Sequence, residues 1–188
     1  MKVKAFAFSA FLLASVSLFS QENETKEPFN YSNITEFGFF ATSPRSIAFE
    51  ATTVNGFSMD KKHCLGIGFG FGCLRSLSDD YDFSYLHMPM FINYRLYFNP
   101  SKTFSPHVNV ALGGTMVTKG GGFYSAVTVG FRAAKFSFSS GISFMPIRTE
   151  VREDISYYDD YGLYLWRENY VKKWLYPLGF TIKCGFSF

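Results

Sequence analysis

The sequence contains few of the residues on which disulfide-rich and metal-binding proteins depend. It has three cysteines, Cys64, Cys73 and Cys184, among its 188 residues. An odd number of cysteines without close spacing indicates neither a disulfide framework nor a zinc site. Tryptophan is scarce as well, with two residues, and there are three histidines. We expect no bound metal and no cofactor.

Charge of one sign and long apolar runs are also lacking. The formal net charge is +3, and the basic residues are scattered along the chain, which gives no support for a nucleic-acid partner. Beyond the first twenty residues, no stretch reaches the ~20 apolar residues that a membrane-spanning helix needs. This absence excludes a helical protein of the inner membrane.

The first twenty residues have the layout of a secretory signal peptide. Lys2 and Lys4 precede an apolar run from Ala5 to Phe19, after which the chain turns polar at "SQENETKE". We predict a signal peptide over residues 1–20 and a short periplasmic segment over residues 21–33. Cleavage after Ser17 and cleavage after Ser20 both remain open.

Phenylalanine is abundant, with 24 residues, and much of it stands at every second position. In the last fifteen residues, "WLYPLGFTIKCGFSF", every even position from Trp174 to Phe188 is apolar or aromatic. The odd positions are mostly small or polar. Because successive side chains of a strand point to opposite faces, this segment is predicted to be one long strand with an apolar side.

The same alternation predicts seven further strands from residue 34 onward. The eight predicted strands span about 34–41, 46–59, 64–73, 85–98, 104–116, 123–132, 136–144 and 174–188. Tight connections follow the second, fourth and sixth strands. Longer ones follow the third, fifth and seventh, at residues 75–85, 117–122 and 148–173. This order predicts an up-and-down meander with tight turns at one end.

The composition of the two strand faces indicates that the apolar face contacts lipid. The other face consists mainly of Gly, Ser, Thr and Ala, with too few charges for a solvated exterior. Seven of the eight predicted strands have at least nine residues, enough for the ~9 to 11 that a tilted transmembrane strand needs. A sheet in hydrocarbon must close on itself to satisfy its backbone. We therefore predict an all-β, transmembrane, antiparallel barrel of eight strands over residues 34–188. A lipocalin-like soluble barrel is the alternative.

Four stretches of the chain resemble the small outer-membrane β-barrel proteins of Gram-negative bacteria, of OmpA/OmpX size. They are "VNGFSMDKKHCLGIGFGFG", "PMFINYRLYFNPSKTFSPHVNVALGG", "GGFYSAVTVGFR" and the terminal strand. The resemblance implies an outer-membrane location and assembly by the barrel-assembly machinery. The last strand resembles the signal that this machinery reads, through Tyr176, Phe180, Phe186 and Phe188. One departure is the segment 148–173, whose "YGLYLW" could extend the sheet beyond eight strands.

An eight-stranded barrel is just wide enough to be filled by side chains, so polar groups that point inward should bond one another. We expect Glu36 to pair with Lys183, with Arg95 as a third partner. The glycines of "GIGFGFG" lack the spacing of a dinucleotide-binding fingerprint and are predicted to leave space for bulky lumen neighbours such as Phe91. The predicted polar network of the lumen consists of Glu36, Glu50, Asn93, Arg95, Asn109, Arg132 and Lys183.

Candidate catalytic residues are few. His87, with Ser84, Asp80 or Asp82 in the same loop, is the one arrangement that fits a lipid-modifying enzyme at the outer rim. A histidine at such a rim is more often a satisfied polar residue. We therefore expect a protein that is not an enzyme.

The segment 148–173 interleaves aromatic residues with balanced charges. Such a surface fits contact with a protein, lipopolysaccharide or a glycan, and it fits an outer aromatic girdle equally well. The candidate contact residues are Tyr157, Tyr158, Tyr161, Tyr164 and Trp166.

Together these features predict a monomeric, non-enzymatic integral protein of the cell outer membrane. It would serve envelope structure or surface interaction through its extracellular loops, in contact with outer-membrane lipid and lipopolysaccharide. Two alternatives stay open, a lipid-modifying enzyme with a site at His87 and a narrow, porin-like passive pore.

Overall fold

The computed structural model describes residues 29–43, 46–77, 83–158 and 164–188, and these residues form an all-β protein. Among them, no helix is long and apolar enough to cross a membrane. The strands are β1 (Phe29–Ser43), β2 (Ser46–Met59), β3 (His63–Ser76), β4 (Ser84–Tyr97), β5 (Phe104–Val117), β6 (Gly120–Ala133), β7 (Phe136–Phe144), β8 (Ile147–Tyr158), β9 (Tyr164–Leu175) and β10 (Leu178–Ser187).

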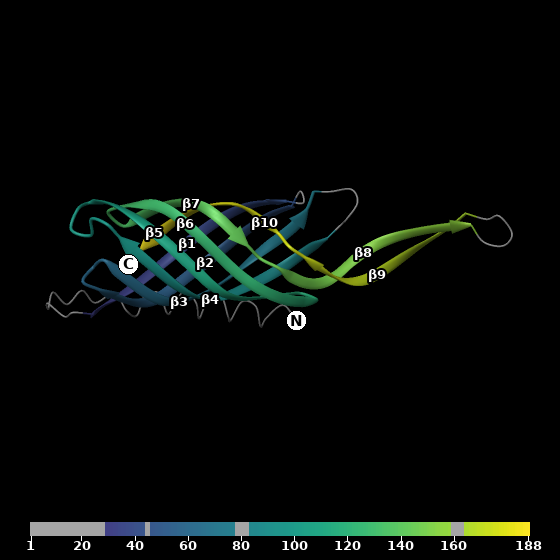
Figure 1. The fold of residues 1–188 in the computed structure, drawn as a ribbon, viewed down its shortest axis with the longest axis horizontal. Coiled ribbons are helices and arrows are strands. Elements are labelled where there is room, and N and C mark those ends of the chain that lie inside the picture. The colour runs from purple at the N-terminus through teal and green to yellow at the C-terminus, as the bar shows by residue number, and fades with distance from the viewer. Residues whose placement is uncertain (1–28, 44–45, 78–82, 159–163) are drawn as a thin grey trace, which may run out of the picture.

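Eight of these strands close into a barrel. The sheet runs β5-β4-β3-β2-β1-β10-β7-β6, and the pairing of β5 with β6 joins its two edges. Every pairing between neighbours is antiparallel. Figure 1 shows the tilted strands wrapping around one axis. The predicted eight-stranded, up-and-down barrel is confirmed.

Strands β8 and β9 form a hairpin that leaves the barrel, as Figure 1 shows at the right. Two proline residues mark the points of departure, since Pro146 separates β7 from β8 and Pro177 separates β9 from β10. Proline cannot donate to a ladder, so each interrupts the pairing of an otherwise continuous strand. The segment 148–173, predicted as a loop, is therefore mostly paired strand. We call this end of the barrel the hairpin end, and the end that holds the β2–β3 and β6–β7 turns the turn end.

The predicted long connection at residues 117–122 is wrong. A two-residue turn of Thr118 and Lys119 joins β5 to β6, and Gly120, Gly121 and Gly122 belong to the ladder. The backbone of β8 crosses these glycines so closely that a Cβ on Gly120 would overlap a carbonyl oxygen of β8. The three glycines therefore allow the backbone of β8 to approach closely, which is a common reason for glycine within a strand.

The first strand also differs from its predicted bounds. β1 begins at Phe29 and pairs with β2 from Phe29 opposite Met59 onward, so it extends into the segment predicted for residues 21–33. Asn33 of this extension is buried and donates to Asn55 Oδ1 on β2 at 2.6 Å.

The outer wall of the barrel is apolar, and the central part of its lumen is mostly polar or small. In β4 the burial alternates at every residue from Ser84 to Arg95. Outward residues such as Phe37 and Leu86 are about two-thirds exposed, with values of 67% and 69%. A soluble barrel would have the opposite arrangement, so the wall is suited to acyl chains. The predicted orientation of the apolar rows is confirmed.

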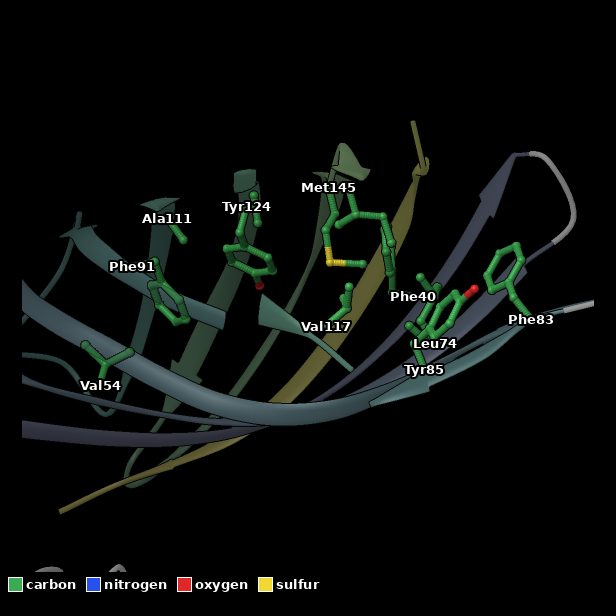
Figure 2. Packing of buried hydrophobic residues seen from close by; sticks show 13 residues of the cluster. Phe40, Val54, Leu74, Phe83, Tyr85, Phe91, Ala111, Val117, Tyr124 and Met145 are labelled. Carbon is green, nitrogen blue, oxygen red and sulfur yellow. The ribbon is translucent and has the colours of Figure 1, made fainter. Parts of the chain in front are cut away.

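The hairpin end of the lumen is filled by apolar side chains, which Figure 2 shows pointing into the barrel. Deeper inside, the ring of Phe91 stacks on that of Tyr124 with centroids 5.2 Å apart. A Cβ on Gly68 would overlap the Phe91 ring, which confirms that inward glycines make room for bulky neighbours. The side chains that fill the hairpin end are Phe40, Ala48, Leu74, Phe83, Tyr85, Val117, Met145 and Ile147.

Candidate functional site

A buried ion pair joins two strands inside the barrel. Arg95 Nη2 on β4 lies 2.6 Å from Glu36 Oε1 on β1, and their side chains are 0% and 4% exposed. Arg95 Nε also donates to Asn109 Oδ1 at 3.4 Å, and Asn93 donates to the same oxygen at 2.7 Å. Asn109 in turn donates to Thr128 Oγ1 at 3.4 Å. This group ties β1, β4, β5 and β6 together across the lumen.

A second buried ion pair lies between β10 and β2. Lys183 Nζ is 2.6 Å from Glu50 Oε1, and Tyr124 on β6 donates to the same oxygen at 3.0 Å. Lys183 Nζ also donates to the Tyr124 hydroxyl oxygen at 3.1 Å. All three side chains are buried, so the ammonium, the carboxylate and the phenol satisfy one another.

The predicted pairing of Glu36 with Lys183 is wrong, and the strand register explains why. Gly38 on β1 lies opposite Lys183 on one side and opposite Glu50 on the other. Because Gly38 has no side chain, Lys183 reaches across it to Glu50. Glu36 lies opposite Gly185 and bonds to Arg95 instead.

The remaining predicted lumen residue lies apart from both groups. Arg132, near the end of β6, is only half-buried and donates to the carbonyl oxygen of Pro100 at 3.2 Å. Its guanidinium carbon lies 4.5 Å from the centre of the Tyr97 ring. It therefore closes the turn end of the barrel and does not join the central network.

The structure does not assemble the predicted catalytic group at the rim. His87 points into the lumen and is 1% exposed, below Phe83 and Tyr85 on the inward side of β4. Ser84 stands at an outward position of the same strand and contacts Cys73 Sγ at 3.9 Å. Side chains of opposite parity on one strand face opposite ways, so these two cannot meet. Asp80 and Asp82 lie outside the described residues.

A pocket of about 290 Å³ lies at the hairpin end, between the barrel mouth and the base of the hairpin. Sequence reasoning missed it because its residues come from four separate segments, which meet only when β8 folds back over Gly120–Gly122. The lining residues are Phe83, Ser84, Tyr85, Thr118, Lys119, Glu150 and Tyr170.

The polar groups of the pocket are held by one ion pair. Lys119 Nζ lies 3.3 Å from Glu150 Oε2, and the same nitrogen lies 4.9 Å from the centre of the Tyr170 ring. Tyr85 donates from its hydroxyl to the carbonyl oxygen of Glu150, which fixes β8 against β4. The Phe83 and Tyr85 rings stack with centroids 5.4 Å apart.

The other predicted site residues belong to the hairpin and the last strand. Tyr157 and Tyr158 lie in β8, Tyr164 and Trp166 lie in β9, and Tyr161 lies outside the described residues. The structure describes no side chain at these positions, so their contact role stays a prediction. The proposed assembly residues Tyr176, Phe180, Phe186 and Phe188 lie on the outward side in and around β10. Their role in assembly also stays a prediction.

The fold and the filled lumen define the class of the protein, a small transmembrane β-barrel. No protein-family model matches the chain, and a search of characterised proteins found no match. Among solved structures, the chain is similar to the outer membrane enzyme PagL, with 10% sequence identity and a TM-score of 0.49. The match covers 80% of this chain and 97% of the PagL chain.

The comparison also corrects one expectation. The similar structure is that of an enzyme, which contradicts our expectation that the chain is not one, and we do not retain that expectation. A likeness of this degree concerns the fold, and it assigns neither a reaction nor a catalytic residue to this chain.

Proposed function

We propose that the chain is a monomeric integral protein of the Gram-negative outer membrane and that it acts at the outer face of that membrane. The observation that carries the proposal is the contrast between a packed lumen and an accessible hairpin end. Two buried ion pairs and an apolar layer fill the lumen, whereas the hairpin and the pocket lie at one end of the barrel. Interaction with lipopolysaccharide, a glycan or another protein at that end would serve the envelope or the cell surface.

The direction of the barrel supports an outward-facing hairpin. Small barrels of this class have short turns on the periplasmic side and longer connections outside. The turn end has tight turns, with positive φ at Asp60, Lys61 and Ala134. The strand ends nearest the two termini, at Ile34 opposite Ser187, also lie toward the turn end. The hairpin end is therefore the extracellular one in our proposal.

An epitope tag tests this orientation in intact cells. We expect an antibody to label cells that carry the tag between β8 and β9. It should label cells with the tag after Lys61, in the β2–β3 turn, only after the outer membrane is permeabilised. Labelling of intact cells through the β2–β3 tag alone would contradict the proposal.

A lipid-modifying reaction at the same face is the second candidate function. The pocket favours it, because one lysine, one glutamate and four hydroxyl-bearing residues line it at the outer end of the apolar wall. Leu86 and Met116, two residues from the lining residues Ser84 and Thr118, are exposed on the lipid-facing side. Mass spectra of membrane lipid from cells with and without the chain distinguish the two functions, since only a lipid-modifying enzyme changes the lipid masses.

A passive pore is the remaining alternative, and the filled lumen argues against it. An ion would have to separate the buried pairs to pass, at a cost of several kcal/mol for each charge left alone. We expect no steady conductance when the purified protein is inserted into planar bilayers. Stepwise conductance of the intact chain would favour the pore.

A further inference from the structure

The pocket at the base of the hairpin has the composition of a site for a small polar ring. Phe83 and Tyr85 form a buried aromatic wall, while the Tyr170 side chain is 54% exposed at its edge. Lys119 and Glu150 lie between them and remain partly exposed, at 49% and 31%. A ligand there would meet aromatic surface and hydrogen-bonding groups together, as in most small-molecule sites.

The charges of the pocket restrict the chemistry of its ligand. Its one ammonium already faces its one carboxylate, so the site has no surplus positive charge for a phosphate. One carboxylate is also too few for calcium, which takes six to eight oxygen ligands. An acyl chain would bury the Lys119–Glu150 pair away from water without replacing its hydrogen bonds. A neutral ligand that both donates and accepts hydrogen bonds avoids each of these costs.

A sugar ring fits these requirements. Its hydroxyl groups can donate to the Glu150 carboxylate and accept from the Lys119 ammonium. The apolar C–H face of the ring can pack on the Tyr170 ring, since aromatic faces provide apolar contact area beside polar groups. A volume of about 290 Å³ lies at the lower end of the range for ligand pockets, so the site suits one ring of an oligosaccharide.

We propose that this pocket binds a sugar ring, supplied by the headgroup of a membrane glycolipid or by a free glycan. The inference deepens the proposed function, because it depends on the hairpin end facing outward. Residues Ser84 and Thr118 of the pocket lie within two residues of the lipid-facing Leu86 and Met116. A glycolipid anchored beside the wall could therefore place its headgroup in the pocket.

Saturation-transfer NMR with free monosaccharides tests the proposal. The purified chain, in a zwitterionic detergent without sugar headgroups, is mixed with glucose, galactose, mannose and N-acetylglucosamine. We expect transfer to at least one of them. Tyr170→Ala should weaken that binding by about three- to tenfold through the lost ring contact. Glu150→Gln, which keeps the shape but removes the charge, should weaken it as well.

The matched control is Tyr176→Ala, which removes an exposed aromatic residue that does not line the pocket. It should bind sugar like the unmodified chain. Each variant is first shown to keep the faster gel mobility of an unboiled folded barrel, so loss of folding is separated from loss of binding. No transfer to any of the four sugars, or equal binding by Tyr170→Ala and the unmodified chain, would overturn the proposal.

A second arm identifies the source of the sugar. The monosaccharide that binds is titrated onto the chain in nanodiscs of phospholipid alone and in nanodiscs that contain lipopolysaccharide. Competition in the second kind of nanodisc supports a glycolipid headgroup, and equal binding in both supports a free glycan. Because the pocket is tested in purified protein, this result is independent of the antibody labelling, which tests whether the hairpin faces outward.

Discussion

The two ends of the lumen are packed by different kinds of side chain. Towards the turn end and centre, two buried ion pairs are surrounded by hydrogen-bonding amide and hydroxyl groups from four other side chains. Towards the hairpin end, Leu74, Met145 and Ile147 pack with other apolar residues. In the first region, the contribution of a charged side chain to stability depends on its one partner. In the second region, the contribution of a side chain depends on the volume that it fills.

The difference shows that, in a barrel surrounded by lipid, side chains in the lumen contribute more to stability than apolar side chains on the outer wall. Apolar side chains on its outer wall gain little from packing against protein, because acyl chains are equally apolar. The lumen therefore has to hold the strands together across the barrel. Its ion pairs connect strands that are not neighbours in the sheet, such as β1 and β4. Three kinds of substitution can test this contrast.

Removing one member of a buried ion pair should have the largest effect. Arg95→Met leaves the Glu36 carboxylate buried and alone, so we expect the free energy of unfolding to fall by about 3 to 5 kcal/mol. Urea unfolding in lipid vesicles measures this change. The double variant Arg95→Met with Glu36→Gln should recover much of the loss, because no charge is then left unpaired. Equal stability of the single and double variants would show that the pair is not the cause.

Truncation in the apolar end of the lumen should have the next largest effect. Leu74 is fully buried, so Leu74→Ala should leave a cavity and lower the free energy of unfolding by about 3 kcal/mol. Leu65 on the same strand faces outward and is 56% exposed. Leu65→Ala should cost less than about 1 kcal/mol, because acyl chains fill the space. If the two variants lost the same stability, the lumen and the outer wall would be equally packed by protein.

The smallest effect is expected at Lys119, whose ion pair is partly exposed, and Lys183 in a buried pair serves as its comparison. Lys183→Met should cost about 3 kcal/mol, because it leaves Glu50 buried without its partner. Lys119→Met breaks an ion pair of the same chemistry that remains partly exposed, so it should cost less than about 1 kcal/mol. The same unfolding measurement compares them. A larger loss at Lys119 would reverse the assignment of buried and exposed pairs.

Much of the fold could be predicted from the sequence because the side-chain alternation of a strand is local. The inward position of Arg95 and the outward position of Ile92 follow from parity along β4. The pairing of charges could not be predicted in this way. The pairing depends on strand register, which places Gly38 between Lys183 and Glu50. Lys183 therefore pairs with Glu50 and not with the expected Glu36.

The pocket could not be predicted because it depends on long-range backbone contacts. The glycines at 120–122 have the composition of a loop, but they pair with β5, and the backbone of β8 crosses them closely. His87 and Ser84 were also grouped by closeness in sequence, although strand parity sends them to opposite faces. The alternation along β4 by itself predicts that these two side chains lie on opposite faces.

The central claim is that the apolar rows face acyl chains while their immediate sequence neighbours face a packed lumen. Phe91 and Ile92 test it directly, since Phe91 is buried inside the barrel and Ile92 is exposed on the wall. Phe91→Trp and Ile92→Trp are each made in a chain carrying Trp166→Phe and Trp174→Phe, then inserted into vesicles whose acyl chains bear bromine. We predict strong quenching of tryptophan fluorescence at position 92 and weak quenching at position 91. Equal quenching at both positions, or stronger quenching at 91, would contradict the account.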